Sequence, residues 1–316
     1  MRSKKLSNKV KIGWIGLGQI GSIMAVNLLR AGYTMIVHDL RPKPGEKLVA
    51  AGAQWAKNPS ELAEAADIVI TSLPGPLQVK KVMESRRGVF SGLHSGGTWI
   101  DMSTTDAQEL KRLGKIAALK GVAVLEAPVT GGLVLAKKGG ITILVGGEKE
   151  VFEAHLPMLE VIGGKILLMG PLGSAIVVKV ISNLLSLGHM ILAGEAFMLG
   201  KRAGIDLEAL FEGIMASSGR SRVIRNEMPL VYNGTYDVGF SMALACKDLG
   251  LVLEMARKYG VPLELGGLIE QIFIRAKTHY GDDTNSTQVV KLIEDTLGDY
   301  LRGEVVEYTP RDKNDF

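Results

Sequence analysis

The sequence predicts an α/β fold: a doubly wound parallel sheet followed by an all-helical second domain. Apolar runs of strand length alternate with helical patterns through the first half of the 316 residues. The alternation stops near Gly170, and only helical patterns follow. Glycine is abundant, at 39 residues, while aromatic residues make up 5%, which suits tight strand-to-helix turns better than an all-β fold.

The first half yields eight short strands, of which the first, at 10–15, is an apolar run typical of a buried strand. Gly32 ends the first helix, Asn58 to Ser60 begins another, and Pro74-Gly75-Pro76 breaks the chain after a strand. The predicted strands are 10–15, 33–39, 54–56, 67–72, 98–101, 123–127, 141–145 and 165–169. The predicted helices are 22–31, 48–51, 59–66, 77–84, 106–120 and 151–161.

The second half yields six helices, predicted at 174–203, 207–216, 219–231, 240–259, 263–279 and 285–300. The expected domains are a basic arm (1–10), a cofactor-binding domain (11–172), a helical domain (173–302) and a tail (303–316). The stretch Ile176 to Leu199 is long enough to cross a bilayer, but Lys179, Asn183, His189 and Glu195 would be costly in lipid. We therefore interpret it as a buried helix and expect no membrane partner.

The charge and cysteine content narrow the class of protein. The net charge is +4, and the first eleven residues alone carry Arg2, Lys4, Lys5, Lys9 and Lys11 without an acid. The folded body is therefore not basic, which argues against nucleic acid as a partner. The arm has no apolar segment of the secretory type, and a single Cys246 permits no internal disulfide. We expect a cytoplasmic protein.

A glycine motif, Gly16-Leu17-Gly18-Gln19-Ile20-Gly21, follows the first strand and opens the first helix. Alone the pattern is weak, but this context is the one that a dinucleotide-binding Rossmann domain requires. Gly16 permits the turn, Gly18 lets the backbone approach a pyrophosphate, and Gly21 lets the helix pack on the sheet. The helix N-terminus favours the phosphates.

Asp39 ends the second strand, where an acid can accept hydrogen bonds from the adenosine ribose. An acid there repels a 2′-phosphate and favours NAD. Arg41 and Lys43 follow directly and would instead bind that phosphate, which leaves NADP as the alternative. We expect NAD to be preferred.

Several separated segments together resemble the β-hydroxyacid dehydrogenase family, typified by 3-hydroxyisobutyrate dehydrogenase, in order and spacing over nearly all of residues 10–300. They are the glycine motif with Met24 to Leu28, Leu73-Pro74, Asp101 to Thr104, Ala127 to Gly132, Gly173 with Lys179 and Asn183, and Phe240 with Lys247 to Leu249. The sequence departs from the family pattern at Thr130, Ala175 and Ser182, where the family usually has Ser, Gly and Asn.

The resemblance implies a role for each matching residue. Ser103, Thr130 and the Gly131-Gly132 backbone would bind the substrate carboxylate; Lys179 would be the catalytic lysine, with Asn183 one helical turn further along. Further cofactor contacts would come from Leu73, Pro74, Gln78, Thr104 and Lys247. The resemblance also implies a homodimer or homotetramer. No pattern of metal-ligand spacing is present in the sequence, so we expect no metal.

Lys179 is a candidate functional residue independently of the resemblance. It stands alone in the apolar run Ile176 to Ile181, and lysines are rarely buried without a purpose. Burial disfavours the charged amine, which makes such a lysine a candidate acid or base near neutral pH. The alternative is a lysine whose amine reaches solvent from a helix edge.

The sequence thus predicts an NAD-dependent oxidoreductase of a small β-hydroxyacid, such as 3-hydroxyisobutyrate, tartronate semialdehyde and its reduced form, or 4-hydroxybutyrate. Two alternatives are an imine reductase, which typically lacks the lysine, and a non-catalytic NAD-binding module. Arg220, beside Gly219 at the start of a predicted helix, is a candidate for gripping the distal end of the substrate. The competing interpretation is a solvated basic face with Arg222 and Arg225.

Overall fold

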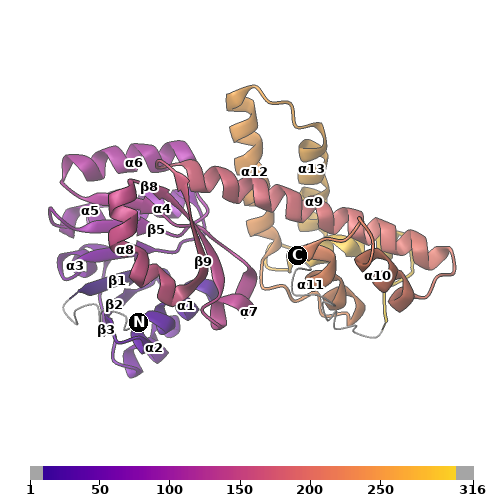
Figure 1. Cartoon of the computed structure of the whole chain (residues 1–316), viewed down its shortest axis with the longest axis horizontal. Helices are drawn as coiled ribbons and strands as arrows, with labels where there is room; N and C mark the ends of the chain where they lie inside the picture. Colours follow the sequence, from indigo (N-terminus) through magenta and orange to yellow (C-terminus); the bar gives the residue numbers. More distant parts are fainter. Residues whose placement is uncertain (1–9, 304–316) are drawn as a thin grey trace. The chain divides into compact units, whose positions relative to one another are not determined.

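The structure is a computed structural model in which residues 10–303 are described. The chain divides into two compact units between Val180 and Ile181. The first unit holds the sheet and the second is helical (Figure 1). The division falls inside one long helix, α9 (Ser174–Arg202), so its first turns belong to the first unit.

The sheet of the first unit has nine strands in the order β3-β2-β1-β4-β5-β6-β8-β7, with β9 beside β8. The strands from β3 to β6 are parallel, as the sequence predicts. Their bounds are β1 (Lys11–Ile15), β2 (Thr34–His38), β3 (Gln54–Trp55), β4 (Ile68–Thr71), β5 (Thr98–Asp101), β6 (Ala123–Glu126), β7 (Val129–Thr130), β8 (Ile141–Gly147) and β9 (Gly163–Gly170).

The sheet is mostly parallel, as the predicted fold class requires, but at one end β8 runs antiparallel to both β6 and β7. The connection from β6 to β8 contains only the two-residue β7 and the six-residue α7 (Gly132–Lys137), neither of which was predicted. A parallel return needs a crossover over the face of the sheet, usually by a longer helix. β8 therefore pairs in the opposite direction.

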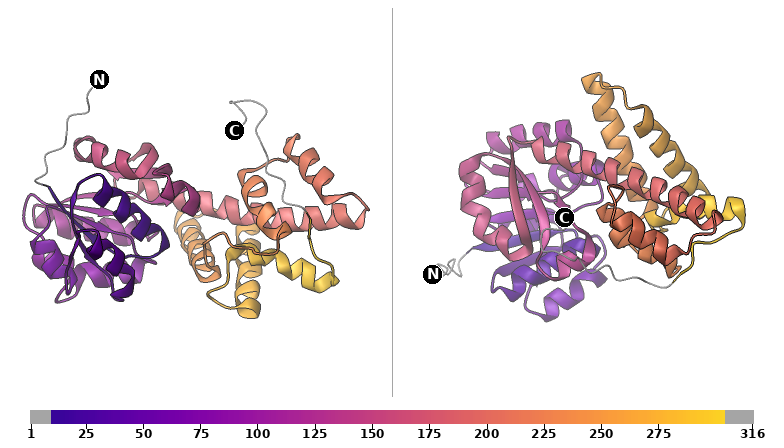
Figure 2. Two further views of the ribbon diagram at one scale, coloured as in Figure 1. Left: turned by 90° about the horizontal axis from the view of Figure 1, so that it is seen from below. Right: turned by 45° about the vertical axis from the view of Figure 1, so that its right-hand side comes forward.

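Helices cover both faces of this sheet (Figure 2). Alternating strand residues feed two cores: Trp14 and Ile100 pack with α1 and α8, whereas Ile15 and Trp99 pack with α3, α4 and α6. The helices are α1 (Gln19–Arg30), η1 (Lys43–Gly45), α2 (Glu46–Ala50), α3 (Pro59–Glu64), α4 (Pro76–Glu84), α5 (Val89–Gly92), α6 (Ala107–Leu119) and α8 (Lys149–Ile162). The four-residue α5 was not predicted.

The second unit packs its helices around a separate core, in which the rings of Phe197, Phe211 and Tyr232 meet. Besides most of α9, it contains α10 (Leu207–Met215), α11 (Arg222–Tyr232), α12 (Met242–Tyr259), α13 (Glu264–Tyr280), η2 (Ser286–Val290) and α14 (Lys291–Leu297). The helix predicted at 219–231 begins later because the Ser221 hydroxyl caps it by accepting from the Ile224 N–H. The predicted last helix is instead a 3₁₀ turn and a short α-helix that ends at Gly298, whose φ is +60°.

Within the described residues, α9 is the one helix long and apolar enough to cross a membrane. The expectation of a buried helix is only partly right, because 39% of its most apolar stretch is buried. One face contributes to the cores, and a second row of apolar side chains is exposed between 39% and 73%. We call this row the α9 stripe; it consists of Val178, Ile181, Leu185, Leu192 and Leu199.

Candidate functional site

The predicted site residues of the first unit gather at one edge of its sheet. Because β1, β4, β5 and β6 are parallel and adjacent, the segments that leave their carboxyl ends share that edge. These segments begin at Gly16, Ser72, Met102 and Ala127. Open α/β sheets bind their ligands at this edge.

The three glycines of the motif differ in what a β-carbon would meet at each position. Gly16 has φ of +97°, and a β-carbon there would lie 2.2 Å from the Ser72 carbonyl oxygen. A β-carbon at Gly21 would lie 2.4 Å from the Gly16 carbonyl oxygen, so α1 packs on the loop only without one. At Gly18 the added atom would meet nothing within 4 Å. The surface over Gly18, at the N-terminus of α1, is therefore open to a ligand, and Leu17, Gln19 and Ile20 complete this turn.

Asp39 follows β2 and holds the glycine loop. Its Oδ2 accepts from the Leu17 N–H at 2.8 Å, and its Oδ1 accepts from the Arg41 N–H at 2.9 Å. A carboxylate offers about four lone-pair sites, so each oxygen keeps one for a ribose hydroxyl. The open backbone at Gly18 and this acid fit the phosphate and ribose ends of a dinucleotide.

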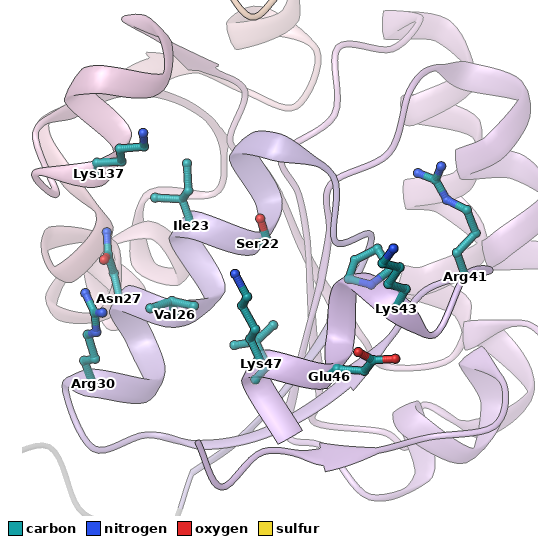
Figure 3. A pocket seen from close by; sticks show the side chains of 12 residues that line it. Ser22, Ile23, Val26, Asn27, Arg30, Arg41, Lys43, Glu46, Lys47 and Lys137 are labelled. Carbon is teal, nitrogen blue, oxygen red and sulfur yellow. The ribbon is translucent and has the colours of Figure 1, made fainter. Parts of the chain in front are cut away.

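A groove of about 700 Å³ lies on the outer side of α1, next to η1 and α2 (Figure 3). Ile23, Val26 and Pro44 line it with apolar surface, and exposed cations surround them with the single acid Glu46. The cations are Arg30, Arg41, Lys43, Lys47 and Lys137. Arg41 and Lys43 are the two cations that would bind the 2′-phosphate of NADP, whereas Asp39 favours NAD.

Ser103 lies below the surface, 2% exposed, in a network of hydrogen bonds. Its hydroxyl donates to Asp101 Oδ1 at 2.6 Å and accepts from the Leu73 N–H at 2.9 Å. Asp101 Oδ1 also accepts from the Thr71 hydroxyl at 2.8 Å, and that hydroxyl accepts from the Trp99 indole N–H at 2.9 Å. This network ties the ends of β4 and β5 together and joins two predicted contact residues, Ser103 and Leu73.

The other predicted contacts of the first unit lie on the same edge with differing exposure. Thr130 and Gly131 are half-buried, and Gly132 is exposed with φ of +78° at the start of α7. A helix start leaves backbone N–H groups without intrahelical partners, so this turn can offer donors to a carboxylate. Pro74 and Gln78 are exposed and Thr104 is half-buried.

Lys179 is half-buried in the second turn of α9. The start of that helix is attached to the same edge by Glu126, the last residue of β6. Glu126 Oε1 accepts from the Gly173 and Ala175 N–H groups at 2.6 and 2.8 Å. Burial raises the pKa of the Glu126 carboxyl to about 7, although these backbone hydrogen bonds act to lower it.

The second unit holds the remaining candidates. Asn183 lies four residues after Lys179 on α9, and its Nδ2 donates to Asp248 Oδ2 at 2.5 Å. Asp248 is 2% exposed, and its Oδ1 lies 2.6 Å from the Lys247 amine. Arg220 is exposed in the loop between α10 and α11. The structure thus brings Asn183 and Lys247 together through Asp248.

Sequence reasoning gave no role to Glu126, Asp101 or Asp248, although all three are buried acids. Asp101 and Glu126 each end an apolar strand, and Asp248 stands within a largely apolar helix. Buried carboxylates are unusual unless they are hydrogen-bonded or paired. An acidic residue within an apolar run of the sequence is therefore the pattern by which these three residues could be identified. No group of three potential metal-binding side chains occurs among residues 10–303.

Comparison with known proteins divides the chain much as its composition does. Residues 11–170 match the family described as the NAD binding domain of 6-phosphogluconate dehydrogenase. Residues 173–293 match the family described as NAD-binding of NADP-dependent 3-hydroxyisobutyrate dehydrogenase. The boundary between these matches precedes α9, whereas the compact units divide within it.

Individual proteins match over almost the whole chain. A 2-(hydroxymethyl)glutarate dehydrogenase from Eubacterium barkeri is 37% identical, covering 94% of this chain and 99% of that protein. The mitochondrial 3-hydroxyisobutyrate dehydrogenase of Mus musculus is 36% identical, covering 86% and 83%. A solved structure of Mycobacterium tuberculosis 3-hydroxyisobutyrate dehydrogenase with L-serine has a TM-score of 0.81 and 27% identity, covering 90% and 99%.

The Rossmann domain with an open glycine turn, followed by a helical domain, is the arrangement of a nicotinamide-dependent oxidoreductase that acts on CH–OH groups. The chain belongs to the β-hydroxyacid dehydrogenase family, as the resemblance in its motifs predicts.

Proposed function

We propose that the protein interconverts a small β-hydroxyacid and its carbonyl form with NAD, and that Lys179 is the general acid and base. The observation that carries the proposal is the position of Lys179. It lies on the opening turns of a helix whose start is bonded to the sheet edge that also bears the open glycine turn. When bound, the nicotinamide supplies hydride transfer.

The Lys179 amine would take the hydroxyl proton during oxidation and return it to the carbonyl oxygen during reduction. Its place in the second turn of α9, the helix whose start is bonded to the sheet edge, supports this role. Asn183, one turn further on the same helix, would hydrogen-bond the reacting oxygen or the lysine. Its link to Asp248 holds its side-chain amide by one N–H.

The substrate carboxylate needs hydrogen-bond donors. The Ser103 O–H is already directed at Asp101, and its backbone N–H donates to the same oxygen at 3.2 Å. We infer that the N–H groups at Gly131 and Gly132 contribute most of the carboxylate binding and that Ser103 contributes when its hydroxyl rotates. The exposure of Gly132 supports this assignment.

A turnover assay with 3-hydroxyisobutyrate, 2-(hydroxymethyl)glutarate, L-serine, 4-hydroxybutyrate and tartronate semialdehyde tests the substrate class, read by NADH absorbance. Lys179→Ala tests the mechanism. We expect kcat to fall by about 10²- to 10⁴-fold with the Kd for NADH unchanged. Lys120→Ala, an exposed lysine at the end of α6, is the matched control. Turnover of Lys179→Ala near the parent rate would show that another group moves the proton.

We further propose that the protein is a homodimer or homotetramer. The α9 stripe supports this, because Val178, Leu185, Leu192 and Leu199 repeat every seven residues and remain exposed. A seven-residue apolar repeat is the spacing by which one helix packs along another. A cytoplasmic location and the lack of membrane or nucleic-acid partners, expected from the sequence, belong to this proposal as well.

A further inference from the structure

Glu126 is a fully buried acid with no assigned part in the chemistry. It is 0% exposed and lies between Asp101 on β5 and Gly146 on β8 in the register of the sheet. The nearby Asp101 charge acts to raise the pKa of Glu126 further. A carboxylate in this environment is costly unless strong donors surround it.

The donors are backbone N–H groups at the start of α9. Glu126 Oε1 accepts from Gly173 and Ala175, and Oε2 accepts from the Ile176 N–H at 3.2 Å. The first N–H groups of any helix lack intrahelical partners, and its N-terminal dipole favours a negative charge. Usually a side chain next to the helix start supplies the cap. Here it comes from a strand 47 to 50 residues earlier.

The surrounding backbone leaves room for this long-range cap. A β-carbon at Gly146 would lie 2.0 Å from Glu126 Oε1, so any side chain there would displace the carboxylate. Gly173 has φ of +98°, a left-handed conformation that glycine adopts without strain and that accompanies its N–H bond to Glu126. Glu126, Gly146 and Gly173 therefore form one unit, which we call the α9 anchor.

The anchor bears directly on Lys179. Ala175 donates one of the anchoring bonds, and Lys179 lies four residues later on the same face of α9. The bonds fix how far the helix start extends from β6 and how it is rotated about its axis. We propose that Glu126 is a positioning residue that sets the location of the Lys179 amine relative to the sheet edge. The inference rests on the proposed role of Lys179.

The test uses the full-length protein with Glu126→Gln, which keeps the shape but removes the charge and one acceptor. We expect kcat for the hydroxyacid that turns over to fall by roughly 10- to 100-fold, as for a small misplacement of a reacting group. The KM for NAD should stay within about twofold, because the glycine turn is untouched. Glu126→Asp, which keeps the charge on a shorter side chain, should recover part of the loss.

Two readouts separate positioning from a loss of stability. The first is the pH dependence of acetylation at Lys179 by acetic anhydride, measured by peptide mass spectrometry. The second is the pH profile of kcat. Both should shift in Glu126→Gln and stay unchanged in Asp206→Asn, which removes a charged cap from α10 instead. Unshifted profiles in Glu126→Gln, or equal shifts in both variants, would overturn the proposal.

Gly146→Ala covers the case in which Glu126→Gln does not fold, because it keeps the acid and displaces it. It should reproduce the loss of kcat and the shift in Lys179 acetylation; a parent-like acetylation profile would overturn the proposal. The acetylation measurement needs no substrate. If Lys179→Ala keeps its activity, but acetylation of Lys179 still differs between the parent protein and Glu126→Gln, the proposed role of Lys179 as acid and base fails while its positioning by Glu126 stands.

Discussion

The side-chain amide of Asn183 on α9 donates to Asp248 on α12, with Nδ2 2.5 Å from Oδ2, across 65 positions of sequence. The other oxygen of the same buried carboxylate pairs with Lys247. One acid therefore orients a predicted active-site amide and a predicted cofactor contact.

We predict that Asp248→Asn lowers kcat/KM for the hydroxyacid by about tenfold or more, because Asn183 and Lys247 both lose their charged partner. Hydrogen bonds to charged groups contribute roughly 1.5–3 kcal/mol, so the free energy of unfolding should also fall. Steady-state kinetics and urea unfolding measure the two effects. Glu254→Gln, an exposed acid on the same helix, should change neither. Parent-like kinetics in Asp248→Asn would show that Asp248 does not position Asn183 and Lys247 for the reaction.

Asp39 should give the enzyme its preference for NAD. We expect kcat/KM to be higher with NAD than with NADP, and Asp39→Asn to reduce the ratio by about tenfold, which corresponds to about 1.4 kcal/mol. Removing the charge weakens ribose binding and relieves repulsion of a 2′-phosphate. Arg41→Ala should reduce the activity with NADP alone, and Arg87→Ala, an exposed arginine outside the groove, should leave the ratio unchanged. A parent enzyme that prefers NADP would contradict the assignment.

Arg220 should distinguish substrates by their far end. Arg220 is exposed in the loop that precedes α11, and its guanidinium can donate two hydrogen bonds to a second carboxylate of the substrate. We predict that Arg220→Ala raises KM more for 2-(hydroxymethyl)glutarate than for 3-hydroxyisobutyrate. Arg222→Ala is the control, since Arg222 acts to lower the pKa of Glu227. Equal effects of Arg220→Ala on the two KM values would show that Arg220 does not bind the distal end of the substrate and belongs to the solvated basic face.

The α9 stripe should hold the subunits together. We predict that the double variant Leu185→Glu, Leu192→Glu has a lower mass in sedimentation than the parent protein. Both leucines are exposed in the single chain, and association of the subunits would bury the two new charges, which opposes it. Leu119→Glu is the control, since Leu119 is 90% exposed at the end of α6 and lies outside the stripe. A parent protein that sediments as a monomer would contradict the proposed assembly.

Much of the fold could be predicted because its signals are local. The strands β1, β2, β4, β5 and β6 are largely apolar runs, and the longer helices show clear stops such as Gly32 and Gly260. The elements α5, β7 and α7, for which the sequence gives no prediction, have between two and six residues, a length over which no periodicity appears. The antiparallel direction of β8 depends on that missed connection.

Only part of the candidate site has a local signal in the sequence. Gly16, Gly18 and Gly21 lie within one turn, so their spacing, together with the strand before them and the helix after them, predicts an open turn at this position. Glu126 acts on a helix start far along the chain, which no local pattern reveals. The exposed row on α9 was missed because length and apolarity cannot tell which faces of a helix are covered.

The double grip of Asp39 on Leu17 and Arg41 has a consequence for the kinetics of cofactor binding. Both bonds are made within the chain itself, so the shape of the glycine loop is held by Asp39. Ordering a loop during association consumes binding free energy and slows productive encounters. A loop already fixed by its own acid escapes both costs. Cofactor association should therefore follow a single concentration-dependent phase, with no slower rearrangement of the glycine turn behind it.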